Sequence, residues 1–180
     1  VWSEILVALP DARLLLKSRA TGDPDVRRRL QDVFAEQGIE AGRLDFHDSV
    51  PSFHDHMAVY NQVDIALDTF PYNGTTTTCE AMWMGVPVIA LAGDVHAARV
   101  GVSLLSAVGM EDYIATDTEG SVALAVQLAH QSERLSAVRE QLRGKLRHAT
   151  LCDGRRFARD MESALRDMWK TWCRQQQRSV

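Results

Sequence analysis

Short apolar strands and amphipathic helices alternate along the first half of this 180-residue sequence. The predicted strands cover residues 13–17, 43–46, 64–68 and 86–91, and the predicted helices cover residues 2–9, 25–37, 53–60 and 76–84. The strands are rich in Leu, Ile and Val, which is typical of parallel strands that are buried on both faces. The alternation therefore predicts an α/β fold, a doubly wound parallel sheet of the Rossmann-like type with helices on both faces.

The second half of the sequence is mainly helical. Helices are predicted over residues 95–107, 118–130, 132–146 and 155–173, with a short strand near residues 113–115. One side of the last helix carries an apolar stripe made of Phe157, Met161, Leu165, Met168, Trp169 and Trp172. A stripe of this size needs a partner surface. If that surface lies outside these residues, we expect the chain to self-associate through the exposed stripe.

Composition narrows the class of protein. Hydrophobic residues make up 46% of the chain and charged residues 24%, an ordinary globular balance. A net charge of -4 argues against general nucleic-acid binding, which relies on a surplus of Lys and Arg. No apolar run reaches the roughly 18 residues that a membrane span needs, so no membrane partner is expected.

Three cysteines without a C-x-x-C pair favour reduced thiols and a cytoplasmic location. The sequence starts without Met and inside a helical pattern, from which we expect a piece of a longer protein.

The most informative stretch covers residues 64–87, D-I-A-L-D-T-F-P-Y-N-G-T-T-T-T-C-E-A-M-W-M-G-V-P. It reads as a buried strand, a turn, four threonines and an apolar helix. Free N–H groups and the positive dipole end at a helix N-terminus favour a phosphate, and Thr hydroxyls add donors. Thr75, Thr76 and Thr77 are the candidate phosphate contacts. Glu80 lies one turn later on the same face, where it can accept hydrogen bonds from sugar hydroxyls.

A simpler interpretation is that one of these threonines only caps the helix while the others are solvated. A cap needs a single hydroxyl, and β-branched Thr is a mediocre helix former. Four threonines in a row therefore suggest a function besides capping. The position of the loop also favours a ligand. Residues 69–75 leave their strand at its carboxyl end, where ligands gather in open α/β sheets.

Three histidines, His47, His54 and His56, follow the strand predicted at residues 43–46. Structural zinc sites usually need four Cys or His ligands, and no Cys accompanies these histidines, so metal is not expected. His56 lies within the predicted helix and can donate to a phosphate oxygen or a sugar hydroxyl. His47 and His54 are expected to be surface or turn residues.

Two further segments follow predicted strands. Lys17 ends the first strand at the same sheet edge, where it either faces the ligand or is a solvated loop lysine. Residues 93–99 start another helix and form a second, weaker candidate anion site. In that segment we expect Asp94 to be the N-cap and Arg99 to brace the structure.

The sequence resembles the C-terminal half of the catalytic region of glycosyltransferase family 41, the O-linked N-acetylglucosamine transferases and SPINDLY-like proteins. The resemblance rests on H-M-A-V-Y-N-Q-V-D-I-A-L-D-T-F-P-Y-N-G-T-T-T-T-C-E-A-M-W-M-G-V-P-V and on A-G-D-V-H-A-A-R-V-G-V-S-L-L, and extends over nearly the whole chain. It implies a GT-B fold, in which two Rossmann-like domains face each other. Residues 1–180 would then form the UDP-sugar-binding domain, with helix 155–173 packing back toward an N-terminal domain outside this sequence.

The resemblance also implies roles for single residues. The family's phosphate-binding His-Thr-Thr falls on residues 75–77, so Thr75 stands where the family has His. The ribose-binding Asp falls on Glu80, and the pocket histidine falls on His56. The family's base-contacting backbone, just before a proline, falls on Val50.

The implied activity is transfer of a sugar, with N-acetylglucosamine expected, from a UDP-sugar to Ser or Thr of a protein acceptor. No metal or other cofactor is expected. The bacterial versions carry tetratricopeptide repeats, and their acceptor-side residues belong to the N-terminal domain, so the present chain alone should be inactive. Because Thr75 departs from the family pattern, the alternative is a non-catalytic Rossmann-like scaffold or regulatory module of a repeat protein.

Overall fold

The structure is a computed structural model that describes residues 1–50 and 52–177. Its α-helices are α1 (Trp2–Ala8), α2 (Pro24–Ala35), α3 (Phe53–Ala58), α4 (Thr76–Trp83), α5 (Val100–Ala107), α6 (Thr118–His130), α7 (Ser132–His148) and α8 (Gly154–Gln177). Its strands are β1 (Leu14–Lys17), β2 (Leu44–His47), β3 (Ala66–Leu67), β4 (Val88–Leu91) and β5 (Ile114–Ala115). Each predicted strand is present, and the α/β prediction is confirmed.

The strands form two parallel ladders. In the first, β1 pairs with β2 in a register that runs from Leu14 opposite Leu44 to Lys17 opposite His47. In the second, β4 lies between β3 and β5 and pairs with both in parallel. Within each ladder the carboxyl ends therefore share an edge, and the loops that leave them can build a common site.

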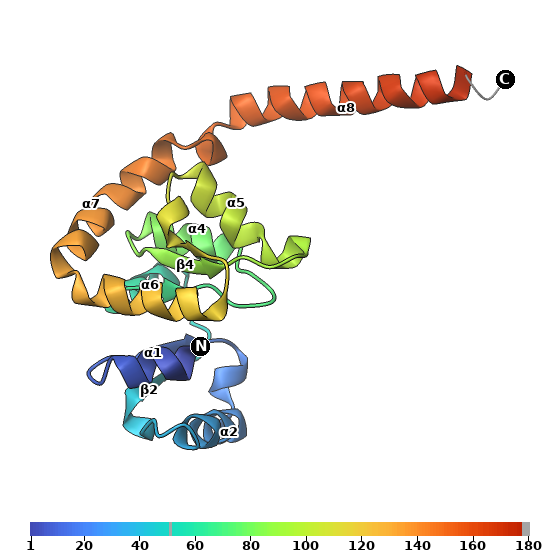
Figure 1. Cartoon of the computed structure of the whole chain (residues 1–180). Helices are drawn as coiled ribbons and strands as arrows, with labels where there is room; N and C mark the ends of the chain where they lie inside the picture. The colour runs from blue at the N-terminus through green and yellow to red at the C-terminus, as the bar shows by residue number, and fades with distance from the viewer. Residues whose placement is uncertain (51, 178–180) are drawn as a thin grey trace.

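The larger hydrophobic core surrounds β4. Val88, Ile89 and Ala90 are consecutive and all buried, which means that both faces of this strand are covered. Helices α4 and α5 supply Met82 and Leu105 to the same core, and α6 and α7 also contribute buried leucines. Figure 1 shows these helices grouped around β4. The α4 start is thereby anchored to a rigid layer of the fold.

A smaller core joins the N-terminal elements. It contains Leu6, Phe34, Ile39 and Leu44, from α1, α2, the segment after α2, and β2. Helix α1 connects the two cores, because Ile5 belongs to the larger core and its neighbour Leu6 to the smaller. In Figure 1, α1, β2 and α2 form the blue part of the chain below the larger core.

One guanidinium group closes the carboxyl end of α1. Arg43 donates hydrogen bonds to the backbone carbonyls of Leu6, Leu9 and Ala12 at 2.7 to 2.9 Å. The last carbonyls of a helix have no intrahelical partner, so a cation that binds them stabilises the helix end. Arg43 thereby ties α1 to the start of β2.

Helix α8 extends away from the rest of the chain (Figure 1). Its predicted apolar stripe is exposed, with Phe157 64% and Trp169 62% accessible. Within residues 1–50 and 52–177 nothing covers this stripe, so its partner surface remains a prediction. No helix of the described chain is both long enough and apolar enough to cross a bilayer. Cys79, Cys152 and Cys173 are free thiols, as predicted.

The single helix predicted over residues 95–107 is wrong. The structure has a short 3-10 helix, His96–Ala98, and α5 starts only at Val100. The break at Arg99 has a physical cause in the backbone, since the N–H of Gly93 donates to the carbonyl of Ala98 and closes a tight turn. The helix predicted over residues 53–60 likewise ends at Ala58 and continues as a 3-10 turn.

Candidate functional site

The loop over residues 68–75 leaves the carboxyl end of β3 and leads into α4. Its shape is held by polar side chains near both ends. Asp68 accepts a hydrogen bond from the N–H of Gly74 at 2.7 Å, and the buried Asn73 side chain donates to the carbonyl of Thr69 at 2.9 Å. Because both bonds close on the loop itself, the start of α4 is fixed without any ligand.

The first turn of α4 presents polar groups to solvent. Thr75 is the N-cap, yet its side chain makes no capping hydrogen bond, so the simple capping role is not what this residue performs. Residues 75–77 are exposed and Thr78 is buried. A Cβ on Gly74 would lie 2.5 Å from Oγ1 of Thr77, so this hydroxyl packs directly on the loop backbone. The uncapped N–H groups, the helix dipole and the hydroxyls together suit an anion.

Three predicted residues from three elements lie in direct contact beside α4. Nζ of Lys17, at the end of β1, lies 2.6 Å from Nδ1 of His56 in α3. On the other side of the imidazole, Nε2 of His56 lies 2.8 Å from Oε2 of Glu80 in α4. The side chains of His56 and Glu80 are only 29% and 16% exposed. The structure thus brings Lys17, His56 and Glu80 into one chain of polar contacts.

Tyr60 completes this cluster and was not predicted. Its hydroxyl lies 3.2 Å from the carbonyl of Thr77 and 3.4 Å from Oε2 of Glu80, so its one proton can be donated to either acceptor. Its ring meets the His56 ring edge-on, with centroids 5.9 Å apart. Burial first, then the Glu80 charge, raises the pKa of Tyr60 well above its ordinary value, so it remains a neutral donor. Its position four residues after His56, one helical turn, was the signal in the sequence.

Lys17 is not a solvated loop lysine. Burial lowers the pKa of Lys17 and the nearby Glu80 charge opposes that effect. Partial burial therefore disfavours the charged ammonium of Lys17, and the Glu80 carboxylate favours it. The contact with His56 argues against a freely solvated Lys17, while the alternative that Lys17 faces a ligand stays a prediction.

The other predicted residues lie around this cluster. Val50 lies between β2 and α3, and its role as a base contact remains a prediction. His47 pairs in register with Lys17 and its carbonyl accepts a hydrogen bond from the Thr21 hydroxyl at 2.6 Å. The side chain of His54 is 93% exposed, as expected for a surface residue.

Exposed aromatic side chains occur at the start of α3 and in the loop before α4, and the sequence did not single them out. Phe53 stacks on His56 with ring centroids 6.3 Å apart and is 71% exposed. Phe70 and Tyr72, in the loop before α4, are 52% and 76% exposed. Exposed aromatic side chains beside polar groups, as Phe53 lies beside His56, are a common feature of surfaces that bind a ligand or a protein.

Residues 93–99, the second candidate anion site, contain one residue with its predicted role and one without it. The guanidinium of Arg99 donates to the carbonyl of Gly93 at 3.0 Å, so the bracing role predicted for Arg99 is confirmed. The prediction that Asp94 is an N-cap is wrong, because Val95 caps the short 3-10 helix and Arg99 precedes α5. The displaced helix start removes Asp94 from the capping position.

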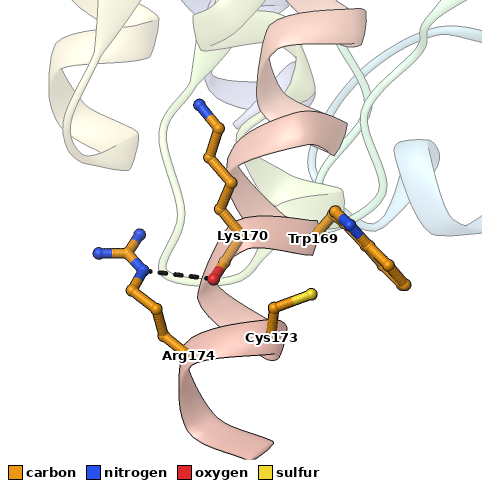
Figure 2. A pocket seen from close by; sticks show the side chains of 4 residues that line it. All are labelled: Trp169, Lys170, Cys173 and Arg174. Atoms are coloured by element: carbon orange, nitrogen blue, oxygen red, sulfur yellow. Dashed lines mark hydrogen bonds between the residues drawn. The ribbon is translucent and has the colours of Figure 1, made fainter. Parts of the chain in front are cut away.

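A metal centre and a surface hollow on α8 are two other candidate sites. Within the described residues, no three His, Cys, Asp or Glu side chains lie close enough together to hold a metal ion. A surface hollow is lined by Trp169, Lys170, Cys173 and Arg174 of α8, where Nε of Arg174 donates to the Lys170 carbonyl at 3.2 Å (Figure 2). All four lining residues come from one helix, so this hollow is an open groove without an opposing wall.

Known proteins resemble this chain over almost its whole length. The family model described as Glycosyl transferase family 41 matches residues 1–161. A probable UDP-N-acetylglucosamine–peptide N-acetylglucosaminyltransferase SPINDLY of Petunia hybrida is 44% identical over 173 residues, 96% of this chain and 19% of that protein. A UDP-N-acetylglucosamine–peptide N-acetylglucosaminyltransferase of Caenorhabditis elegans is 29% identical over 96% of this chain and 15% of its own length.

A solved structure agrees with these sequence matches. A mutant O-GlcNAc transferase of Thermobaculum terrenum superimposes with a TM-score of 0.88 at 39% identity, covering 93% of this chain and 32% of that one. The present chain therefore spans about a fifth of the length of the SPINDLY relatives that it matches, and about a third of the solved relative.

Proposed function

The chain belongs to glycosyltransferase family 41 and has the α/β architecture of one half of a GT-B fold, and we propose that it is the donor-binding domain of a protein O-glycosyltransferase. One observation carries the proposal. The open N-terminus of α4 lies on the same side as the polar chain of Lys17, His56 and Glu80, so phosphate donors and sugar-hydroxyl acceptors are adjacent. A nucleotide diphosphate sugar needs both kinds of group.

Each end of the site has its own chemistry. The diphosphate is proposed to lie at the start of α4, where N–H groups and the hydroxyls of Thr75, Thr76 and Thr77 can donate to it. Glu80 accepts from ribose hydroxyls and His56 borders the nucleotide. During transfer the departing diphosphate gains negative charge, which pre-oriented donors stabilise without reorganisation. The helix N-terminus supplies this stabilisation, so no metal or other cofactor is required in the proposal.

The activity of the longer protein is part of the same proposal. The relatives are named for moving N-acetylglucosamine from UDP-N-acetylglucosamine to peptides, so we infer a UDP-sugar donor, N-acetylglucosamine as the sugar, and Ser or Thr of a protein as acceptor. Acceptor-side residues would come from an N-terminal domain, against which α8 would pack. Tetratricopeptide repeats and a cytoplasmic location, the latter supported by the three free thiols, complete the proposal.

Calorimetric titration of the chain with UDP and with UDP-N-acetylglucosamine tests the donor site. The double variant Thr76→Ala, Thr77→Ala should bind at least about tenfold more weakly, because hydrogen bonds to a charged group contribute roughly 1.5–3 kcal/mol each. A double variant with Thr116→Ala and Thr118→Ala is the matched control, since these exposed threonines flank the start of α6. It should bind like the original chain.

Two results would overturn the proposal. One is the absence of binding at millimolar ligand, and the other is equal binding by both double variants. Either would favour a non-catalytic Rossmann-like scaffold, for which the presence of Thr75 in place of the family's His is the supporting observation.

A further inference from the structure

We propose that Lys17 is a positioning residue for donor binding, which fixes one tautomer of His56 and thereby orients the carboxylate of Glu80. This inference rests on the proposed donor site. It goes further because Lys17 does not contact the ligand in this proposal. Lys17 instead acts on the ligand through His56 and Glu80. The three residues lie on β1, α3 and α4, so the chain of contacts also joins three separate elements.

The first step is the direction of the hydrogen bonds. A lysine ammonium has three donors and no acceptor. At 2.6 Å from Nζ of Lys17, Nδ1 of His56 must therefore be the acceptor and carry no proton. The proton of the neutral ring is then on Nε2, which donates to Oε2 of Glu80 at 2.8 Å. The ammonium thus selects the only neutral tautomer that can also donate to the carboxylate.

The second step is the orientation of Glu80. Within the described residues, both recorded donors to this carboxylate converge on one oxygen, since Nε2 of His56 and the hydroxyl of Tyr60 both point to Oε2. Oε1 is the oxygen that remains to accept from a sugar hydroxyl. A carboxylate held by two donors is pre-oriented, which lowers the entropic cost of binding.

The third step concerns a second proton on the imidazole. Protonation of Nδ1 would place two cationic donors face to face at 2.6 Å, a strongly repulsive arrangement. The charged groups facing His56 are Lys17 from β1 and Glu80 from α4, while Tyr60 is a neutral neighbour from the turn after α3. His47 lies across the ladder from Lys17, and His54 with Asp55 are neighbours within α3 itself. A charged Lys17 at this distance therefore disfavours a proton on Nδ1 of His56.

Long-range ¹H–¹⁵N correlation spectra of the ligand-free chain test this assignment directly. The six histidines are few enough to assign, and a His56→Gln spectrum identifies the relevant signals. We expect His56 to show a protonated Nε2 and an unprotonated Nδ1 that persist from pH 8 to 6, around the range in which histidines ordinarily titrate. A protonated Nδ1 in the original chain would overturn the proposal without any Lys17 variant.

Variants of Lys17 separate charge from mere packing. Lys17→Met keeps much of the side-chain length without the charge, and in this variant His56 should take a second proton as the pH falls from 8 to 6. Lys17→Arg, which also has donors only, should retain the original pattern. Lys170→Met is the matched control, because this exposed α8 lysine forms a surface ion pair with Asp167, away from His56. Unchanged His56 signals in Lys17→Met would overturn the proposal.

Binding of UDP-N-acetylglucosamine supplies the second readout, since its diphosphate carries no proton that titrates near neutral pH. We expect Lys17→Met to bind roughly tenfold more weakly, because without the hydrogen bond between Lys17 and His56 the Glu80 carboxylate is no longer pre-oriented for the ligand. Its affinity should also fall from pH 8 to 6, because an imidazolium paired with Glu80 makes that carboxylate a weaker acceptor for sugar hydroxyls. The original chain and Lys17→Arg should show no such pH dependence. Equal affinities and pH profiles would refute the positioning role.

The two hypotheses fail in different ways. If the original chain binds no UDP-N-acetylglucosamine, the donor site itself is refuted, whatever the tautomer. If it binds while Lys17→Met changes neither tautomer nor affinity, only the role of Lys17 is refuted.

Discussion

Nε2 of His56 lies 2.8 Å from Oε2 of Glu80, although the two residues are 24 positions apart and belong to different helices. The contact joins α3, which follows β2, to α4, which follows β3. It makes Glu80 a carboxylate with one oxygen engaged by the protein. The availability of the other oxygen leads to the first prediction.

Glu80→Gln should weaken binding of UDP-N-acetylglucosamine by about tenfold, because a charged acceptor for sugar hydroxyls is lost. The isosteric change preserves packing, so the midpoint of thermal unfolding should move little. Calorimetry and a thermal melt check both parts. Glu140→Gln, an exposed position on α7, is the control and should alter neither quantity. Unchanged affinity in Glu80→Gln would remove Glu80 from the site.

Gly74→Ala should disturb the start of α4. The new Cβ would lie 2.5 Å from Oγ1 of Thr77 and 2.7 Å from Oγ1 of Thr78, so both hydroxyls must move. We expect a loss of about 1–3 kcal/mol in the free energy of unfolding, as for other overpacking substitutions, together with weaker UDP binding. Urea titration and calorimetry measure the two effects.

Gly144→Ala is the matched control for that experiment. Gly144 lies in α7 and a Cβ there meets nothing within 4 Å. Alanine is the better helix former by roughly 0.5–1 kcal/mol, so this variant should be as stable as the original chain or more so. If both glycine variants lose stability equally, crowding at Thr77 is not the cause.

Arg43→Ala should destabilise the N-terminal part of the chain. The carbonyls of Leu6, Leu9 and Ala12 would lose their donor, at a cost of about 1–3 kcal/mol for partly buried polar groups. Chemical denaturation followed by circular dichroism measures the change. Arg29→Ala, at an exposed position of α2, should be close to neutral. Equal effects of the two substitutions would argue against the capping role of Arg43.

Asp68 should make stability depend on pH. Its Oδ2 is buried without a hydrogen-bond partner, and burial raises the pKa of Asp68, partly opposed by the backbone N–H groups of Gly74 and Thr69. For an acid with a raised folded pKa, the folded state binds the proton more tightly. The contribution of Asp68 therefore falls as pH rises from the unfolded value of about 4 through the folded pKa, and is then constant.

Comparison with Asp68→Asn isolates this contribution, because the amide does not titrate. The free energy of unfolding of the original chain, relative to that of Asp68→Asn, should decrease between about pH 4 and neutrality. Urea titrations at several pH values supply the measurement. A constant difference across that range would mean that Asp68 titrates alike in the folded and unfolded chain.

The exposed face of α8 should make the isolated chain self-associate. Leu165 and Trp169 are 57% and 62% exposed and belong to an apolar stripe that the described residues leave uncovered. Light scattering should show a mass that grows with concentration, and Leu165→Lys with Trp169→Lys should return the chain to a monomer. Arg159→Ala on the same helix is the control. A concentration-independent monomer in the original chain would contradict the prediction.

Much of the fold follows from sequence patterns because they are local. The strand at β4 and the helix α6 lie where the apolar periodicity predicts them, and α6 has the predicted bounds of residues 118–130. The break at Arg99 could not be read in this way. It depends on a turn closed between Gly93 and Ala98, whose residues are compatible with a continuous helix.

The sequence indicated which residues belong to the candidate site, but it did not indicate which of them are in contact. Strand ends and helix starts single out Thr77, Glu80, His56 and Lys17, because ligands gather at the carboxyl ends of parallel strands. That Lys17 reaches Nδ1 of His56 depends on side-chain conformations and on packing between residues 39 positions apart. Tyr60 lies four residues after His56, but its contact with Glu80 depends on how the turn after α3 packs against α4, which the sequence does not show.

Helix α1 contributes Ile5 to one hydrophobic core and Leu6 to the other, and the proposed donor site also takes its residues from elements of both cores. Lys17 extends from a strand of the smaller core, whereas Glu80 belongs to a helix of the larger one. The site therefore exists only while the two cores are docked. A bound nucleotide sugar would contact elements of both cores and hold them together. Ligand binding would therefore make the two cores unfold together.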